Sequence, residues 1–470
     1  MNNSEFVQWL RGAAPYINTH RGRTFVLALG GDALAHANFV PITHDIALLT
    51  SLGVRLVLVH GARQQIEAAL AAAGSPPRYQ QHLRVTDEGA MTIVKGVVGA
   101  LEIQIEARLS TGMPGTPMHN ARVRVVSGNF VAARPMGVVD GVDLGFTGQV
   151  RKVDVAGIRA QLDIGNIVLL SPLGYSPSGE AFNLNADDLA AAVATALAAD
   201  KLIMLDDQPG VMDDSGAVLS ELTPAELQAL VDRMRPGSSR AVRLNALLRA
   251  ARSGVARAHV VSYVDDGALL TELFTHVGTG TQVAQQSYET LRAASADDVA
   301  GIIELIRPLE EQGVLVRRSR DVLERECDQF VVAELDGLII GCAALVPFAG
   351  EQVGELACLA IHPEYRQRTP LSSHLRASHL RASHVRASQL QADPAAPAGG
   401  GARTLGAALL IEIEQRARRG GLSRLFALTT QTSDWFKEHG FHAATVAELP
   451  AARQAHYNLQ RNSKVLIKEL

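Results

Sequence analysis

A carboxylate stands at the start of one apolar strand and could act there as a proton acceptor. Glu355 is followed by Leu-Ala-Cys-Leu-Ala-Ile, an apolar run typical of a buried strand. An amine attacks a thioester only after it loses its proton, so this chemistry needs a general base beside the nitrogen. It also needs N–H donors for the oxyanion, which the backbone of a splayed strand can supply. Glu355 is therefore a candidate general base for acyl transfer; the alternative is a surface residue at a strand end.

Two glycine-containing turns could serve a second kind of chemistry, the binding of phosphate groups. Gly30-Gly31 and His60-Gly61 each follow a predicted strand and precede a predicted helix. Backbone N–H groups at such turns can hold a phosphate. Glycine also serves simply as a turn former, so this pattern alone does not identify a site.

The elements that would position these turns alternate between strands and helices. This alternation predicts a mostly parallel α/β sheet covered on both faces, in a first domain over residues 1–283. The predicted strands and helices are Thr24–Leu29, Arg55–His60, a helix from about Gln64, Ile167–Ser171, a helix over Asp187–Ala199, Lys201–Leu205, Ala258–Val261 and a helix over Gly267–Phe274.

A different pattern predicts a second, smaller domain over residues 288–470. It begins with helices and then a hairpin that turns at Asp336-Gly337, which indicates an α+β fold with an antiparallel start. Its predicted elements are helices Ala296–Leu309 and Arg320–Cys327, strands Phe330–Leu335, Leu338–Val346 and Glu355–Ile361, helix Leu405–Arg418, strand Arg424–Leu428, helix Ser433–His439 and a terminal strand near Lys464–Lys468.

A low-complexity insertion over residues 368–401 interrupts the second domain. From Ser373 a five-residue unit of the type Ser-His-Leu-Arg-Ala repeats, and a Pro/Ala/Gly tract follows it. A period of five matches neither a helix nor a strand, so we expect disorder. His374, His379 and His384 could suggest a metal site, but a repetitive expansion without ligand function is the simpler interpretation. We predict no metal and no cofactor.

Composition limits the class of protein. The 470 residues need more than one core, and the net charge of −4 gives no basic field for nucleic acid. Apolar runs such as Leu189–Ala199 are too short to cross a bilayer, and residues 1–8 lack the pattern of a signal peptide. Three widely spaced cysteines form no disulfide framework, so we expect a cytoplasmic protein with no membrane partner.

The first domain resembles the amino-acid kinase family, and the N-acetylglutamate kinases in particular. Two cations of those kinases are missing: Ala28 stands at a lysine position, and the Gly-rich stretch near Gly237–Ala246 offers only Arg240 and Arg243. Phosphoryl transfer depends on charge stabilisation, so the resemblance implies a kinase fold without kinase activity. His60-Gly-Ala-Arg63 looks like the variant in bacterial N-acetylglutamate synthases. The matching stretches are residues 27–31, 57–61, 84–87, 183–187 and 272–275.

The second domain resembles the GCN5-related (GNAT) acetyltransferases, and specifically that domain of the bacterial N-acetylglutamate synthases. The matching stretches are residues 307–309, 315–320, 354–360, 362–365, 425–430, 435–436, 440–441 and 457–464. The resemblance implies transfer of the acetyl group of acetyl-CoA to the α-amine of L-glutamate, the first step of arginine biosynthesis.

The same resemblance implies the roles of individual residues. Glu355 would be the general base, and Thr429 would hold or protonate the leaving thiolate. Arg318, Arg461 and Ser463 would bind the glutamate carboxylates, since arginine can form bidentate pairs with a carboxylate. Cys358 is expected to be a buried strand residue and not a nucleophile. Acetyl-CoA would contact Cys358, Leu359, Ala360 and Ile361 on the strand, and Arg403, Thr404, Leu405 and Gly406 at the next helix.

The insertion falls in the loop that binds the CoA pyrophosphate in this family. The expected pattern is Arg/Gln-x-x-Gly-x-Gly/Ala, and Tyr365-Arg366-Gln367 begins it. Aligned from the following helix, Gly406 takes the last glycine position, whereas Thr404 and Gly401 occupy the other two positions. The entropic cost of a longer loop is small, about 0.6 kcal/mol per doubling of its length. The geometric requirement is stricter, because the backbone N–H groups must still converge on the phosphates at the start of the helix. Either residues 399–406 rebuild the loop with help from Arg403, or CoA affinity falls.

The family also implies regulation and assembly. In arginine-sensitive relatives the inhibitor lies between an N-terminal helix, here Phe6–Tyr16, and the end of the kinase-like domain. Tyr16, Lys201, Glu272 and Gly278 stand at matching positions; the alternative for Glu272 is a surface residue at a helix end. The family further implies a homo-oligomer, commonly a hexamer. Two alternative functions remain. One is an N-acetylglutamate kinase, and the other is an arginine sensor whose acetyltransferase has been disabled by the insertion.

Overall fold

A computed structural model describes residues 3–112, 116, 118–275, 278–284, 290–335, 338–365, 404–458, 461 and 463–470. The chain forms two compact units, Met1–Gln285 and Gln286–Leu470. The insertion at 368–401, its three histidines and Arg403 lie outside the described residues. No helix in the described part of the chain is both long enough and apolar enough to cross a membrane.

The first unit is built on an eight-stranded sheet whose central strands are parallel. The five strands from β15 to β10 run parallel, and β16 is antiparallel to β15. Every residue of the central strand β13 is buried, as expected for a strand covered on both faces. The strand order is β14 (Glu221–Leu222), β16 (Thr281–Val283), β15 (Arg257–Ser262), β13 (Lys201–Asp206), β1 (Thr24–Leu29), β2 (Arg55–His60), β10 (Ile167–Leu170) and β5 (Val125–Ser127).

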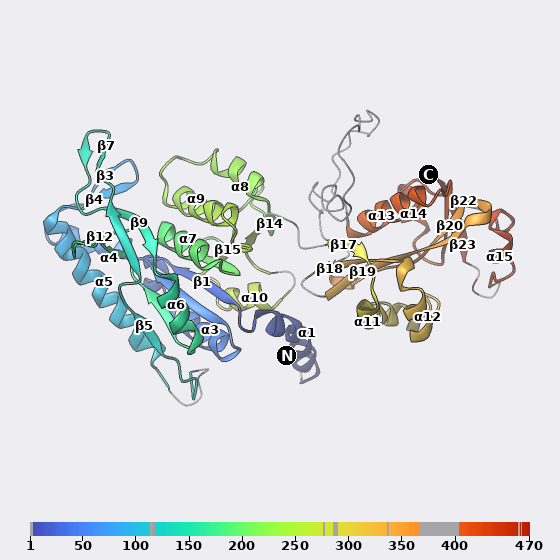
Figure 1. Ribbon diagram of the computed structural model, residues 1–470, viewed down its shortest axis with the longest axis horizontal. Helices are drawn as coiled ribbons and strands as arrows, with labels where there is room; N and C mark the ends of the chain where they lie inside the picture. Colours follow the sequence, from blue (N-terminus) through green and yellow to red (C-terminus); the bar gives the residue numbers. More distant parts are fainter. Residues whose placement is uncertain are drawn as a thin grey trace. The chain divides into compact units, whose positions relative to one another are not determined.

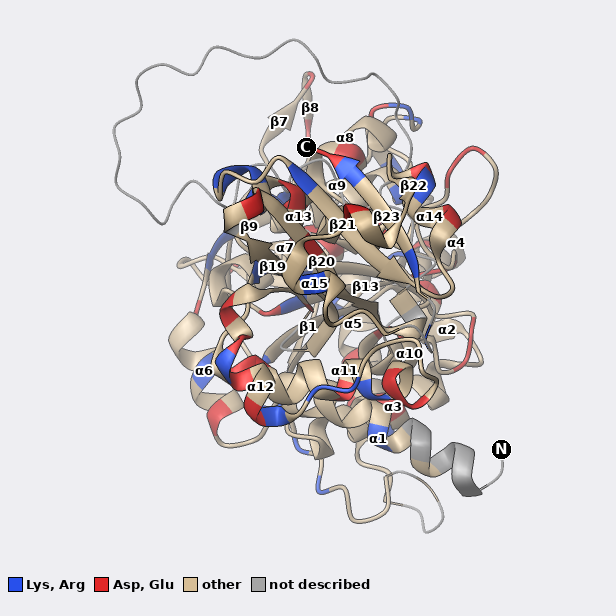
Figure 2. Ribbon diagram, turned by 90° about the vertical axis from the view of Figure 1, so that its right-hand side faces the viewer, with Lys and Arg blue, Asp and Glu red and all other residues tan. Residues whose placement is uncertain are grey.

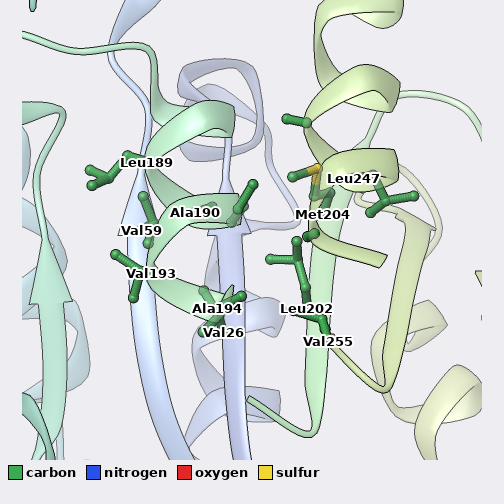
Figure 3. Packing of buried hydrophobic residues seen from close by; sticks show 14 of the residues in the cluster. Val26, Val59, Leu189, Ala190, Val193, Ala194, Leu202, Met204, Leu247 and Val255 are labelled. Carbon is green, nitrogen blue, oxygen red and sulfur yellow. The ribbon is translucent and has the colours of Figure 1, made fainter. Parts of the chain in front are cut away.

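Helices cover the two faces of this sheet because successive strand residues point to opposite sides. On one face α7 (Ala186–Leu197) and α9 (Ser239–Arg252) pack against Val26 and Met204 (Figure 3). On the other face α3 (Phe39–Ser51), α5 (Glu88–Leu109) and α10 (Ala268–Phe274) pack against Phe25 and Leu27. The remaining helices of the unit are α1 (Asn3–His20), α2 (Gly31–Ala35), α4 (Arg63–Ala72), α6 (Val155–Asp163) and α8 (Pro224–Val231).

Smaller sheets lie beside the main one. A four-stranded sheet has the order β12 (Ala181–Asn183), β11 (Leu173–Tyr175), β6 (Val131–Pro135) and β9 (Gly148–Val153), and two hairpins pair β3 (Arg78–Gln80) with β4 (Leu83–Val85) and β7 (Val138–Val139) with β8 (Val142–Asp143). Neither these strands nor α5 were among the elements expected from the sequence.

The second unit is a mixed seven-stranded sheet. All neighbouring strands are antiparallel except β20 and β21, which run parallel. Figure 1 shows α13 and α14 on one face of the sheet and α11 and α12 on the other. Figure 2 shows acidic and basic residues together on α12. The strand order is β17 (Thr290–Ala293), β18 (Phe330–Leu335), β19 (Leu338–Phe348), β20 (Val353–Ile361), β21 (Arg424–Thr429), β23 (Lys464–Glu469) and β22 (His442–Ala444), and the helices are α11 (Val299–Glu311), α12 (Arg320–Arg325), α13 (Leu405–Arg419), α14 (Ser433–Glu438) and α15 (Ala451–Gln454).

The predicted fold class is confirmed: a mostly parallel α/β unit precedes a smaller α+β unit.

Candidate active site and regulatory site

Strand β20 contains a bulge in its second half. Its register with β19 runs from Ala344↔Ala357 to Cys342↔Ala360, so β20 has one extra residue there. Cys358 in this segment has φ 53°, in the left-handed region that non-glycine residues seldom adopt. In the described residues the ladder between β20 and β21 ends at Leu356↔Ala427. A ligand could therefore lie between the diverging strands and meet the backbone of β20.

The bulge changes which side chains of β20 share a face. Leu356, before the bulge, packs in the hydrophobic cluster under α13. Leu359 and Ile361, after the bulge, pack against the same cluster. Cys358 and Ala360 pack instead with α11, on the same face as Glu355. The four strand residues predicted to contact acetyl-CoA therefore point to alternate faces of the bulged segment. Cys358 is buried, as predicted.

Glu355 is held by an arginine that the sequence analysis missed. Arg453 on α15 donates from Nε to Oε2 of Glu355 at 2.8 Å and from Nη2 to Oε1 at 3.1 Å. The exposed fractions of the two side chains are 12% for Glu355 and 24% for Arg453. This is a bidentate pair, the geometry that arginine forms best with a carboxylate. No periodic pattern in the sequence marks Arg453, because it lies on a helix of four residues.

Thr429 is the last residue of β21, beside the opening between β20 and β21. Its Oγ1 accepts from the backbone N–H of Thr432 at 3.1 Å and of Gln431 at 3.3 Å, and it lies 3.0 Å from the Thr432 hydroxyl. Because two backbone donors occupy this oxygen as an acceptor, its own proton faces the Thr432 hydroxyl. Donation from Thr429 to a thiolate stays a prediction.

Arg318 and Arg461 lie near the segment after α11. The guanidinium of Arg461 donates to the carbonyl of Val314, and its Nε is buried without a hydrogen-bond partner. Arg318 Nη1 lies 3.2 Å from Glu326. The carbonyl of Ser463 accepts from the Tyr457 hydroxyl at 2.5 Å. The two arginines thus come to one side of the sheet, and Arg318 has an acidic partner there.

The N-terminus of α13 lies against the end of β20. The Oγ1 of Thr404 caps the helix by accepting from the backbone N–H of Ala407. A Cβ on Gly406 would lie 3.0 Å from Ile361 and 3.2 Å from Trp435, so glycine permits this close approach. The first N–H groups of a helix attract phosphates. Thr404, Leu405 and Gly406 therefore lie where a pyrophosphate could bind, whereas Arg403 is outside the described residues.

The first unit keeps a cavity of about 680 Å³ at its glycine-containing turns. Gly30, Gly31 and Gly61 line it, together with the side chains of Asp187 and Arg243.

The arginines near this cavity already have carboxylate partners. Arg243 pairs with Asp187 at 3.6 Å and also with the buried Asp206, which Arg240 contacts at 2.9 Å. Burial raises the pKa of Asp187, and the charge of Arg243 opposes that rise. These two cations therefore neutralise carboxylates of the protein, and position 28 is alanine. The absence of kinase activity stays a prediction.

Three of the four predicted arginine-site residues come together in a buried chain. Lys201 Nζ lies 3.4 Å from His259 Nε2, and His259 Nδ1 lies 2.7 Å from Glu272 Oε1. Glu272 Oε2 also accepts from Gly280 N at 2.8 Å, and a Cβ on Gly278 (φ 62°) would lie only 2.5 Å from it. Glu272 is thus a buried partner of a histidine and not a surface residue.

Burial and neighbouring charges set the protonation of this chain. Burial, together with Lys201, lowers the pKa of His259 to about 4. Burial also lowers the pKa of Lys201, against the opposing charge of Glu272. Neutral His259 can accept from Lys201 and donate to Glu272. His20 lies in α1 with Tyr16, and its Nε2 is 2.8 Å from the carbonyl of Leu273. No motif in the sequence marks either histidine.

Metal binding has no support in the described part of the structure. No group of three or more His, Cys, Asp or Glu side chains in that part could hold a metal ion.

Two family models match the chain, the amino acid kinase family over residues 23–262 and the acetyltransferase (GNAT) family over residues 299–369. An amino-acid acetyltransferase of Pseudomonas aeruginosa is 52% identical over 466 residues, which cover 99% of this chain and all of the relative, and one of Azotobacter vinelandii is equally similar. The chain belongs to the amino-acid acetyltransferase family. It is an acyltransferase, as predicted.

Solved structures agree with this family. N-acetylglutamate synthase from Neisseria gonorrhoeae, complexed with coenzyme A and L-arginine, is 37% identical with a TM-score of 0.81, and 99% of each chain is covered. The same enzyme complexed with coenzyme A and N-acetyl-glutamate is 39% identical with a TM-score of 0.59 at the same coverage. The resemblance to bacterial N-acetylglutamate synthases is confirmed.

Proposed function

We propose that this enzyme transfers the acetyl group of acetyl-CoA to the α-amine of L-glutamate. The observation that carries the proposal is the opening between β20 and β21, with Glu355 before it, Thr429 at its edge and the start of α13 at its end. Complexes of the related synthase with coenzyme A and N-acetyl-glutamate support both substrates.

In the proposed reaction Glu355 takes a proton from the ammonium group of the substrate, directly or through a water. The free amine attacks the thioester carbonyl, and backbone N–H groups of the bulged segment stabilise the oxyanion. The tetrahedral intermediate then forms the amide as the C–S bond breaks, and the second amine proton leaves. Thr429 donates a hydrogen bond or a proton to the thiolate of CoA. Arg318, Arg461 and Ser463 bind the carboxylates of glutamate.

We further propose that L-arginine binds in the first unit beside Lys201, Glu272 and Gly278, with Tyr16 of α1 nearby. The support is the buried carboxylate of Glu272, which can pair with a guanidinium, and the related synthase complexed with L-arginine. We also propose a homo-oligomer, commonly a hexamer in this family, which light scattering would measure. The proposed location is the cytoplasm, which cell fractionation would test.

The first test is a thiol-release assay for CoA with acetyl-CoA and L-glutamate. We expect glutamate-dependent release, and a loss of about 100-fold or more in Glu355→Ala, because general-base catalysis contributes 10²–10⁴-fold. Added arginine should reduce the rate. If well-folded protein releases no CoA but binds arginine, the sensor alternative is correct; ATP-dependent phosphorylation of N-acetylglutamate would instead support the kinase.

A further inference from the structure

The bidentate pair between Glu355 and Arg453 conflicts with the role of Glu355 as a free base. Both carboxylate oxygens accept from the guanidinium, at 2.8 and 3.1 Å. The pair is largely buried, so its attraction is only weakly screened by solvent. Both oxygens therefore face the guanidinium, and the ammonium group of the substrate must compete with Arg453 for the same carboxylate. Close approach of that ammonium group to Glu355 calls for another partner for Arg453.

The substrate itself carries a group that can do so. If the α-amine of glutamate lies within hydrogen-bond reach of Glu355, the α-carboxylate lies two bonds from that nitrogen. It is then the closer of the two substrate carboxylates to the guanidinium of Arg453, whereas the γ-carboxylate is separated from the α-carbon by two methylene groups. Arg318, Arg461 and Ser463, proposed above for the two carboxylates, would then bind the γ-carboxylate, and both arginines lie near the segment after α11.

We propose that Arg453 is the receptor for the α-carboxylate of the amino-acid substrate, and that this carboxylate replaces Glu355 on the guanidinium and frees the base. This inference rests on the proposed assignment of Glu355. The exchange makes deprotonation depend on the correct substrate, because an amine without an α-carboxylate leaves the pair closed. The preference for an α-amino acid thus comes from the activation of the base as well as from binding.

The local structure leaves the guanidinium able to change partner. The backbone of α15 has its own tie to the sheet region, since Ala451 N donates to Glu351 Oε1 at 3.1 Å. Arg453 Nη1 also donates to the carbonyl of His456 at 3.3 Å, which holds the side chain near the strand. The helix therefore keeps this tie when the guanidinium leaves Glu355.

The test compares L-glutamate with 4-aminobutyrate, which is glutamate without its α-carboxylate. In Arg453→Ala we expect kcat/KM for glutamate to fall about 10- to 100-fold, the value of one charge-assisted interaction. We expect kcat/KM for 4-aminobutyrate to rise, because Glu355 is then free. The two changes have opposite signs, so the ratio of kcat/KM for glutamate to kcat/KM for 4-aminobutyrate should fall by more than kcat/KM for glutamate alone. Arg453→Lys should give an intermediate ratio.

The matched control is Glu351→Ala, which removes the other tie of α15 and keeps Arg453. It should leave the ratio of the two constants unchanged. If Arg453→Ala lowers both constants in parallel, or leaves both unchanged, the α-carboxylate assignment is wrong and Arg453 only anchors α15. Glu355→Ala separates this from a failure of the proposed function: undiminished glutamate turnover there refutes the base assignment itself, whatever the Arg453 variants show.

Discussion

Replacing Glu272 by glutamine should reduce both the local stability of the first unit and its affinity for arginine. The carboxylate accepts from His259 at 2.7 Å, from Thr279 N at 2.9 Å and from Gly280 N at 2.8 Å. An amide has only one oxygen, so its NH₂ group must face either His259 or the two backbone donors. At least one bond to a charged acceptor is lost, which costs about 1.5–3 kcal/mol. Glu272→Ala removes all of them and should cost about 3–5 kcal/mol.

Hydrogen exchange of the peptides that contain β15 and α10 measures the stability term. A loss of about 2 kcal/mol in Glu272→Gln should speed exchange there by about 30-fold. Calorimetric titration with arginine measures the binding term, and we expect a weakening of about 10- to 100-fold, because the guanidinium loses its anionic partner. Glu88→Gln, at an exposed position on α5, is the control.

Two results would refute this reasoning separately. Unchanged arginine affinity in Glu272→Gln would show that the inhibitor does not bind at this carboxylate. Unchanged exchange of β15 and α10 in Glu272→Ala would show that the buried chain from Lys201 to Glu272 contributes little to the stability of the unit.

Two other predictions concern one residue in each unit. Asp45 on α3 is buried, and burial together with Asp266 raises its pKa to about 7. Because the folded pKa exceeds the unfolded value, its contribution to stability is present below pH 4 and is lost as the pH rises to 7. Asp45→Asn should therefore increase the free energy of unfolding more at pH 8 than at pH 5, by up to about 3 kcal/mol. Thermal unfolding at the two pH values measures this, and an equal gain at both would contradict it. Gly406→Val should raise KM for acetyl-CoA about tenfold or more and leave KM for glutamate unchanged, because its side chain would meet Ile361 and Trp435; steady-state kinetics with each substrate varied decides, and a parallel rise in both constants would contradict it.

Much of the sheet architecture could be predicted from apolar runs. Strand Arg55–His60 has the bounds that the sequence indicated, because a strand buried on both faces is apolar throughout. The strands β6, β11 and β12 are shorter and only partly buried, so they lack such a run. The bulge at Cys358 adds a residue without changing the apolar composition of β20, so no sequence pattern marks it.

The partners of the site residues were the least predictable feature. Arg453 lies 98 residues from Glu355 in the chain, and their pairing depends on the packing of α15 beside β20. His259 sits in an apolar strand, where a lone histidine gives no indication that it joins Lys201 to Glu272. The family resemblance marked Glu355 and Glu272. Their partners, Arg453 and His259, are identified only by the tertiary structure.

The arginine pairs at the kinase-like cavity have a consequence for substitutions at position 28. Ala28 packs in the apolar core beneath α7 and α9, and Arg243 lies close to Gly30 at the same turn. A lysine restored at position 28 would bury an ammonium group there, beside a guanidinium already committed to Asp187 and Asp206. A lysine at position 28 would therefore compete with Arg243 for the same carboxylates, and a second substitution at the cavity would be needed to leave one of the two cations for a phosphate group.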